Sequence, residues 1–224
     1  MPDSNAPGSK TCAVRALLYA EDPYENPRLT YPEDLQGWGS YDAVFKTVIE
    51  EVRPKLIVEV GTWKGASAVH MATLCKAAGL QSEIVCVDTW LGNWQHWSRR
   101  EGIGSRVDLH LINGFPTLYF QFLSNVLARG QSDVITPLPL PSVAAAKLFQ
   151  HYSLKPDVVY IDGDHEYESV NIDLRLWSLV LAPGGVLFGD DHDWPGVNRA
   201  VTELVANGGW DLKLERNKFR LRKT

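Results

Sequence analysis

The chain has no long hydrophobic run and no excess of basic residues. None of its apolar stretches reaches the roughly 20 residues of a transmembrane helix, and residues 1–10 are polar, unlike a secretory signal peptide. The formal net charge is -5, so the composition offers no obvious surface for a polyanion. We therefore expect a cytoplasmic protein that binds neither a membrane nor a nucleic acid directly.

Cysteine is also scarce. The chain has Cys12, Cys75 and Cys86, and their spacing matches no metal-binding motif. Two of them lie in apolar segments, which suits small buried residues in a reducing compartment. The 224 residues are enough for one sizeable core and few for two ordinary domains. We expect a proline-rich tail and arm over residues 1–39, followed by a single domain over residues 40–224.

The chain does contain a regular alternation of strand-like and helix-like segments. A first helix is expected to begin near Ser40 and to end before Pro54. Buried strands are then predicted at 56–60, 84–87, 134–138, 158–161 and 186–188, and helices at 67–78, 143–151 and around 170–180. This order predicts an α/β fold, with a single doubly wound, mostly parallel sheet and helices on both faces.

The segment at 89–131 is too long for an ordinary connection and is rich in tryptophan, tyrosine and phenylalanine. Long insertions at the ligand edge of a sheet commonly serve as lids or binding loops. Part of this one, 117–128, has a helical pattern and also fits an ordinary crossover helix. A lid is therefore one expectation, and a connection whose aromatic residues only anchor it to the core is the other.

Two acidic turns follow predicted strands near the end of the chain. Residues 161–165 read IDGDH and residues 189–193 read GDDHD. Ligands of open α/β sheets bind outside the carboxyl ends of the strands, so both turns are expected to face one shared cleft. Each acidic residue also has an ordinary alternative, because an Asp after a strand is often a helix cap. We assign the residues with the weakest functional claim to caps, solvated turns and an exposed helix face: Asp164, Glu166, Glu168, Asp173, His192 and Asp193.

A glycine loop follows the first predicted strand, where residues 57–67 read IVEVGTWKGAS. Gly61 permits a ligand to approach the backbone closely, and Gly65 lets a helix begin tight against the strand. Amides at that helix start favour a carboxylate or phosphate. The pattern lacks the three-glycine dinucleotide fingerprint, which disfavours NAD. Asp88 ends the next strand and is expected to accept both hydroxyls of an adenosine ribose, with a helix cap as its alternative role.

Over roughly residues 40–201 the chain resembles a class I S-adenosylmethionine-dependent methyltransferase with a Rossmann-like fold. The resemblance rests on Val58-Glu59-Val60-Gly61 with Gly65, on Asp88 and on Pro183-Gly184-Gly185-Val186. Residues 160–167 (YIDGDHEY) and 189–191 (GDD) further resemble the metal-dependent O-methyltransferases of sugar and macrolide hydroxyls and the related cephalosporin-biosynthesis enzymes.

The resemblance implies a cofactor, a metal and a base. S-adenosylmethionine would be held at its methionine part by Glu59, Gly61, Gly65 and Ser67, at its ribose by Asp88 and near its adenine by Ser142. The implied ligands of Mg²⁺, or of another divalent cation, are Asp162, Asp190 and Asp191, and the implied general base is His165. In plant and catechol-type enzymes an amide residue follows the late Asp, whereas His192 follows here, so the choice between Asp190 and Asp191 stays open.

The chemistry of the carboxylates agrees with this implication. A hydroxyl is a poor acid, and coordination to a hard cation brings its pKa within reach of a neutral imidazole. Carboxylate oxygens suit such a cation. The expected function is therefore S-adenosylmethionine-dependent, Mg²⁺-dependent O-methylation of a small molecule such as a sugar, a glycoside or a natural product.

Three other functions were weighed. An NAD-dependent oxidoreductase of the short-chain type would use Tyr152 and Lys155, but Pro156 follows them and ends the helix they require. A phosphatase would use Asp162 and Asp164, although such a motif normally lies near the start of the chain. A catalytically inactive cofactor-binding module is the third alternative. Neither the hydroxyl acceptor nor the formation of a homo-oligomer follows from the sequence.

Overall fold

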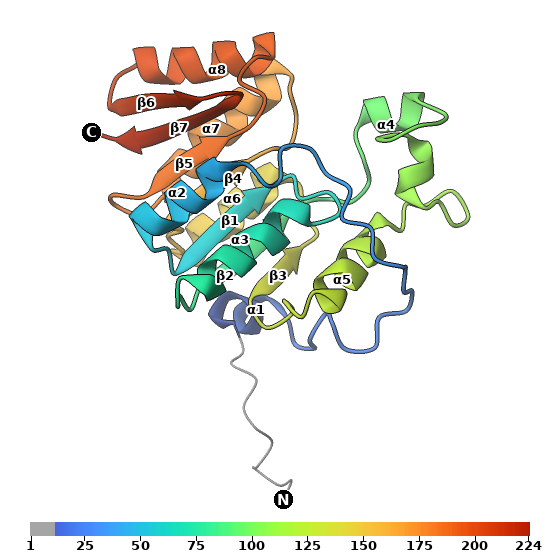
Figure 1. Ribbon diagram of the computed structural model, residues 1–224. Coiled ribbons are helices and arrows are strands. Elements are labelled where there is room, and N and C mark those ends of the chain that lie inside the picture. Colours follow the sequence, from blue (N-terminus) through green and yellow to red (C-terminus); the bar gives the residue numbers. More distant parts are fainter. Residues whose placement is uncertain (1–11) are drawn as a thin grey trace, which may run out of the picture.

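The structure, a computed structural model, describes residues 12–224 and contains one seven-stranded sheet (Figure 1). Residues 1–11 of the predicted tail and arm lie outside the described residues. The strand order is β3-β2-β1-β4-β5-β7-β6. β1 to β5 are parallel, and β7 runs antiparallel to both of its neighbours. The strands are β1 (Leu56–Val60), β2 (Glu83–Val87), β3 (Ile135–Leu138), β4 (Val158–Ile161), β5 (Val186–Gly189), β6 (Trp210–Glu215) and β7 (Lys218–Lys223).

Helices cover both faces of the sheet, which confirms the predicted fold class. Buried side chains of α2 (Ala43–Val52), α3 (Ala66–Ala77) and α5 (Leu118–Ala128) pack on one face. The helices on the other face are α1 (Ala13–Leu18), α6 (Ser142–His151), α7 (Tyr167–Val180) and α8 (Pro195–Ala206). The five parallel strands are apolar almost throughout because both faces are buried.

The strand register decides where the loops meet. Val60 pairs with Val87 on one side and with Ile161 on the other, and Ile161 pairs with Gly189. The carboxyl ends of β1, β2, β4 and β5 are therefore level with one another. The glycine loop, Asp88 and both acidic turns leave the sheet along the same edge, as the alternation of elements predicts.

The hairpin of β6 and β7 was not among the predicted elements. Its first strand is half exposed along its whole length, so its sequence lacks the apolar run that marks the buried strands. β7 inserts between β5 and β6, and Phe219 and Leu221 bury their side chains in the core. The hairpin therefore closes one side of the sheet and brings the start of β7 next to the second acidic turn.

The segment at 89–131 has two parts. α5 lies between β2 and β3 in the chain and buries Phe122 against the sheet, so it is the ordinary crossover helix. The part before it contains α4 (Trp94–Ser98) and the 3-10 helix η1 (Arg106–Leu109), and it projects away from the sheet (Figure 1). In this part Trp90 is buried, whereas Trp94 and Phe115 are largely exposed.

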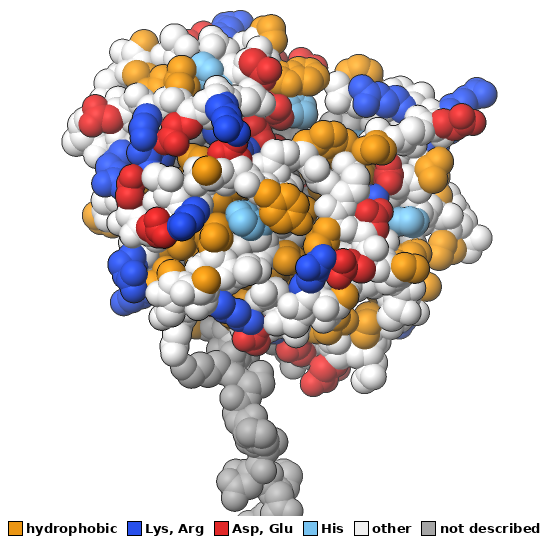
Figure 2. Space-filling view, in the orientation of Figure 1, with side chains coloured by type: hydrophobic (Ala, Val, Ile, Leu, Met, Phe, Trp, Pro, Cys, Tyr) orange, Lys and Arg blue, Asp and Glu red, His pale blue; other side chains and the backbone are white. Residues whose placement is uncertain are grey.

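The surface carries mixed charge. On the face shown in Figure 2, acidic and basic side chains are interspersed. None of the described helices is long and apolar enough to cross a membrane.

Candidate functional site

Gly61 joins the glycine loop to the first acidic turn. Its φ of 81° lies in the left-handed region that favours glycine. A Cβ atom at this position would overlap the backbone carbonyl oxygen of Asp162 and the Cα of Gly163. Gly65 also has a left-handed backbone, and its Cβ would meet the ring of Phe122 at 2.9 Å. The two glycines thus let the loop lie against the neighbouring turn and against α5.

Asp88 organises the same loop from the end of β2. Its Oδ2 accepts hydrogen bonds from the backbone amides of Thr62 and Trp63 at 3.0 and 2.9 Å, and its Oδ1 accepts one from Trp90 at 2.7 Å. Burial raises the pKa of Asp88, and these three amides partly oppose that rise. The side chain lines the cavity described below. Ribose binding by Asp88 stays a prediction.

Glu59 lies underneath the loop and not in the cavity. Its carboxylate is fully buried and accepts hydrogen bonds from the hydroxyls of Thr62 and Ser67 and from the thiol of Cys86. Burial raises its pKa to about 7. Strand alternation points this side chain into the core below α3, so it does not line the cavity. The assignment of Glu59 to the methionine part of the cofactor stays a prediction.

Ser142 lies at the start of α6, where the sequence places it. Its hydroxyl donates to Asp173 Oδ1 at 2.6 Å and accepts from the indole of Trp177 at 2.9 Å. The assignment of Asp173 to an exposed helix face is wrong: this residue of α7 is 7% exposed and lines the cavity. Burial raises its pKa to about 6, although the Ser142 hydroxyl works against the rise. A polar pair therefore stands at this end of the cavity.

A cavity of about 860 Å³ runs along the carboxyl edge of the sheet. This volume is in the range of sites for drug-sized ligands. Most of the predicted site residues line it, whereas Glu59 and Gly65 do not. The predicted residues in its wall are Gly61, Ser67, Asp88, Ser142, Asp162, His165, Asp190 and Asp191.

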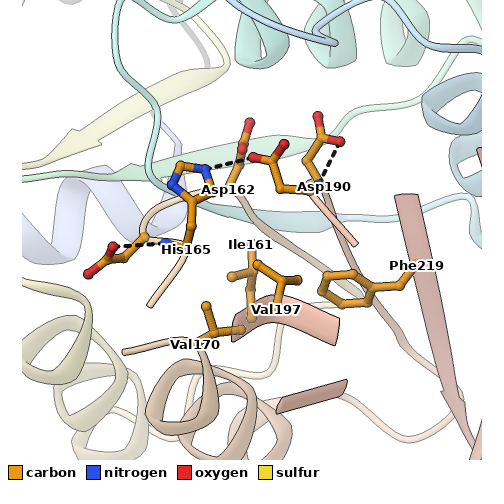
Figure 3. Close-up of a pocket in the computed structure, with 9 residues that line it drawn as sticks. Ile161, Asp162, His165, Val170, Asp190, Val197 and Phe219 are labelled. Atoms are coloured by element: carbon orange, nitrogen blue, oxygen red, sulfur yellow. Dashed lines mark hydrogen bonds and ion pairs between the residues drawn. The ribbon is translucent and has the colours of Figure 1, made fainter. Parts of the chain in front are cut away.

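His165 and Asp191 form a hydrogen-bonded pair across the two acidic turns (Figure 3). The imidazole Nε2 lies 2.7 Å from Asp191 Oδ2, and the two side chains are 25% and 26% exposed. The hydrogen bond that the imidazole donates to Asp191 raises the pKa of His165. Burial works to raise the pKa of Asp191, but the hydrogen bond with His165 holds it below its usual value. The imidazole also stacks on Trp194, with ring centroids 4.6 Å apart, so its orientation is fixed.

The other two carboxylates have internal partners. Asp162 Oδ2 accepts a hydrogen bond from the Tyr160 hydroxyl at 2.8 Å, and burial raises the pKa of Asp162 well above its usual value. Asp190 forms an ion pair with Lys218, whose side chain is 2% exposed. Figure 3 shows apolar side chains packed beneath these acids, namely Ile161, Val170, Val197 and Phe219.

The three carboxylates do not fit a divalent cation as they are arranged. Both oxygens of Asp190 and of Asp191 accept hydrogen bonds or ion pairs from the backbone, from Asn217, from His165 or from Lys218. Within residues 12–224, no group of three or more His, Cys, Asp or Glu side chains has a geometry able to hold a metal ion. The predicted Mg²⁺ site is therefore not confirmed.

The structure also adds wall residues, most of which the sequence patterns did not single out. The exception is Trp38, which together with the aromatic residues of 89–131 suggests a sugar-like or planar ligand. Trp63 stacks on His96 with ring centroids 4.6 Å apart, and its indole donates to Gln36 Oε1 at 2.9 Å. Trp38 and Trp194 are 56% and 43% exposed and border the open side of the cavity. These residues come from the arm, the glycine loop, α4 and the second acidic turn, so no local spacing relates them.

The rival motifs receive no support from the geometry. α6 ends at His151, so Tyr152 and Lys155 lie beyond the helix and do not share a helix face. Asp164 Oδ1 accepts hydrogen bonds from the backbone amides of His165 and Glu166 at 2.8 and 3.4 Å, so it orders the turn before α7. It does not cap the helix as expected, because the N-cap of α7 is Glu166 and the helix has no side-chain cap.

Comparison with known proteins identifies relatives in sequence and in fold. Residues 58–192 match the family described as "Methyltransferase domain". An uncharacterized protein of Sinorhizobium fredii, y4gI, is 26% identical over 171 residues. The match covers 76% of this chain but 16% of that protein, so the chain spans only a small part of this relative's length.

Solved structures share the fold at low sequence identity. CalS11, a calicheamicin methyltransferase, has a TM-score of 0.57 and 19% identity over 80% of this chain and 76% of its own. The O-methyltransferase from Bacillus cereus has a TM-score of 0.57 and 13% identity over 87% and 84% of the two chains. The O-methyltransferase NovP has a TM-score of 0.55 and 20% identity over 81% and 78%. Because the family match also spans more than half of the 224 residues, this chain belongs to the methyltransferase-domain family.

Proposed function

We propose that the protein is an S-adenosylmethionine-dependent O-methyltransferase that acts on a hydroxyl group of a small molecule. One observation carries the proposal: the hydrogen-bonded pair of His165 and Asp191 lies in the same cavity as the glycine loop and Asp88. A group able to accept a proton and the residues proposed to bind a nucleoside thus line the same cavity. Methyl transfer to oxygen needs both at once.

Relatives of similar fold support the choice of cofactor and acceptor atom. The Bacillus cereus structure is an O-methyltransferase in complex with SAH, and NovP is also an O-methyltransferase. The cavity of about 860 Å³ has room for a nucleoside cofactor and part of an acceptor. Gly61 lines this cavity, and the absence of a Cβ atom there lets the glycine loop lie directly against the turn that carries Asp162.

The proposed reaction assigns the proton to His165. A neutral imidazole that donates its Nε2 hydrogen to Asp191 carries its lone pair on Nδ1. In the proposed step Nδ1 accepts the proton of the acceptor hydroxyl while that oxygen bonds to the methyl carbon. When bound, S-adenosylmethionine supplies this methyl group on a sulfonium, and the electrons of the broken carbon–sulfur bond remain on sulfur. Asp191 stabilises the imidazolium that results.

The acceptor side of the cavity favours a sugar-like or planar molecule. Trp38 and Trp194 expose large aromatic faces there, and Arg99 and Ile103 also border the cavity. Aromatic side chains supply apolar faces together with polar handles, which suits glycosides and phenolic natural products.

His165→Gln tests the proposed base. General-base catalysis contributes about 10²- to 10⁴-fold, so turnover should fall by roughly that factor while the affinity for S-adenosylhomocysteine stays the same. Turnover is measured as transfer of labelled methyl from S-adenosylmethionine to a panel of sugars, glycosides and phenols, and affinity is measured by calorimetry. The control is His192→Gln, at the residue that directly follows Asp191 in the chain, and it should keep full turnover.

Cofactor choice is tested separately on the unaltered chain. S-adenosylhomocysteine at 100 times its dissociation constant should stabilise the protein by about 2.7 kcal/mol, which thermal unfolding detects. Stabilisation by NAD instead would favour an oxidoreductase. Binding of S-adenosylhomocysteine without transfer to any hydroxyl in the panel would favour an inactive cofactor-binding module.

A further inference from the structure

A buried ammonium group lies among the acidic residues of the site. Lys218 is the first residue of β7, and the pairing of Gly189 with Phe219 places it beside the end of β5. Its side chain is 2% exposed. The ammonium forms an ion pair with Asp190 and donates a hydrogen bond to the Tyr160 hydroxyl at 3.2 Å. A lysine is almost never fully buried unless it is paired, so the partners of Lys218 are needed to hold its charge in the core.

The positive charge reaches a second carboxylate through Tyr160. The Tyr160 hydroxyl accepts from Lys218 and donates to Asp162 Oδ2 at 2.8 Å. The ammonium also lies 5.2 Å from the ring centroid of Phe45 and 5.4 Å from that of Tyr160. Aromatic faces attract a cation at this range and keep water away from it. One lysine therefore connects Asp190 with Asp162 from the core side of the site.

The third carboxylate is held by other groups. Asp191 Oδ2 is paired with His165, and its Oδ1 accepts a hydrogen bond from Asn217 Nδ2 at 3.2 Å. Asn217 also donates to Asp190 Oδ1 at 3.2 Å. A divalent ion would have to displace these partners and would stand close to a buried ammonium. Its repulsion by that ammonium is strong because the interior screens charge poorly.

We propose that Lys218 is the resident cation of this site, that it takes the position a divalent metal would fill, and that it holds Asp162 and Asp190 for an acceptor hydroxyl. Lys218 is then a positioning residue. Only the part of this proposal that concerns the acceptor hydroxyl rests on the proposed function. The assignment of Lys218 as the cation rests on the geometry of the side chains.

Manganese binding to the full chain tests the cation. The free Mn²⁺ signal in electron paramagnetic resonance is measured after the protein has been stripped with EDTA and dialysed. We expect the unaltered chain to bind no Mn²⁺ up to about 1 mM, the weak end of protein–cation affinities. Lys218→Met keeps much of the side-chain volume but removes the charge, and it should bind Mn²⁺ at least about tenfold more tightly. Adding Asp190→Asn to Lys218→Met should remove the gained site.

Two control variants separate the charge at this site from charge in general. Lys213→Met removes a lysine that is 58% exposed on β6 and should bind no more Mn²⁺ than the unaltered chain. Lys218→Arg keeps a cation at the site and should also gain no Mn²⁺.

Binding of one Mn²⁺ by the unaltered chain, lost in Asp190→Asn, would overturn the proposal. If circular dichroism shows that Lys218→Met is unfolded, the measurement on the unaltered chain still decides. S-adenosylhomocysteine binding is measured in the same EDTA-treated sample. Failure of that binding would count against the proposed methyltransferase function, whereas the Mn²⁺ result would still decide the assignment of the cation.

Discussion

At the scale of single residues, Gly61 combines a left-handed backbone with a close backbone contact. Its left-handed backbone and its contact with the backbone of the first acidic turn both require the absence of a Cβ atom. Gly61 therefore sets the spacing between the glycine loop, proposed to bind the cofactor, and the first acidic turn, proposed to bind the acceptor. Other left-handed glycines, such as Gly79 after α3, lie in open space.

Gly61→Ala should lower the free energy of unfolding by about 2–5 kcal/mol. A left-handed alanine costs about 1–2 kcal/mol, and the overlap with the Asp162 carbonyl adds about 1–3 kcal/mol. The control is Gly79→Ala, which bears the backbone strain without the overlap and should cost about 1–2 kcal/mol. Urea unfolding measures both, and equal losses in the two variants would show that the contact with Asp162 has no energetic weight.

At the scale of elements, Lys64 joins segments that are far apart in the sequence. It lies in the glycine loop with its side chain 2% exposed, and its ammonium pairs with Asp34 of the arm at 2.6 Å and with Asp108 of η1 at 2.7 Å. Asn125 of α5 binds the backbone carbonyl of Lys64 and that of Asp34. The arm and the projecting part of 89–131 are thus fastened over the same loop, and both contribute walls to the cavity.

Lys64→Met should release the arm and the η1 segment without unfolding the sheet. Breaking a buried ion pair costs about 3–5 kcal/mol, and the exposure of Asp34 lowers the expected loss to about 1–3 kcal/mol. Amide hydrogen exchange should rise by about 5- to 150-fold in residues 31–38 and 99–109, while the parallel strands keep their protection.

The matched control for Lys64→Met is Lys76→Met. Lys76 lies in the last turn of α3, at the other end of that helix from Lys64, and forms an exposed ion pair with Asp133 at 2.8 Å. Its loss should therefore leave exchange in both segments unchanged. Unchanged exchange in Lys64→Met itself would mean that other contacts fasten the arm.

At the scale of the whole molecule, buried acids make stability depend on pH. Burial raises the pKa of Glu59 to about 7 and that of Asp173 to about 6. A group with a raised folded-state pKa binds its proton more tightly in the folded protein. The contribution of these two acids to stability is therefore present below their unfolded pKa values, near 4, and falls as the pH rises through about 6 to 7.

Glu59→Gln should reduce the fall in the free energy of unfolding as the pH rises. The shift of Glu59 corresponds to about 3 kcal/mol between about pH 4.5 and pH 7, and a glutamine has no proton to lose. Urea unfolding at both pH values measures the difference. Glu50→Gln on the exposed side of α2 is the control and should leave the pH dependence unchanged. A pH dependence that survives in Glu59→Gln would assign the effect to other groups.

Much of the fold was predictable because each parallel strand has a local signature. β1, β4 and β5 are short apolar runs bounded by turn residues, and the predicted bounds of β1 and β4 agree with the structure. β6 lacked such a signal, because a half-exposed edge strand contains many polar residues. α8 was not among the predicted elements either. Prediction from periodicity therefore worked best where an element is buried on both faces.

The sequence by itself determined the parallel sheet, the glycine loop and the gathering of both acidic turns at one edge. The succession of strands and helices along the chain, and the positions of the loops between them, follow from local patterns. Only the tertiary structure decided what each acid does. It buried Glu59 and Asp173, paired His165 with Asp191, and brought Lys218 to Asp190 across 28 positions of the chain. Side-chain burial and partners depend on contacts between distant segments, and no local spacing encodes them.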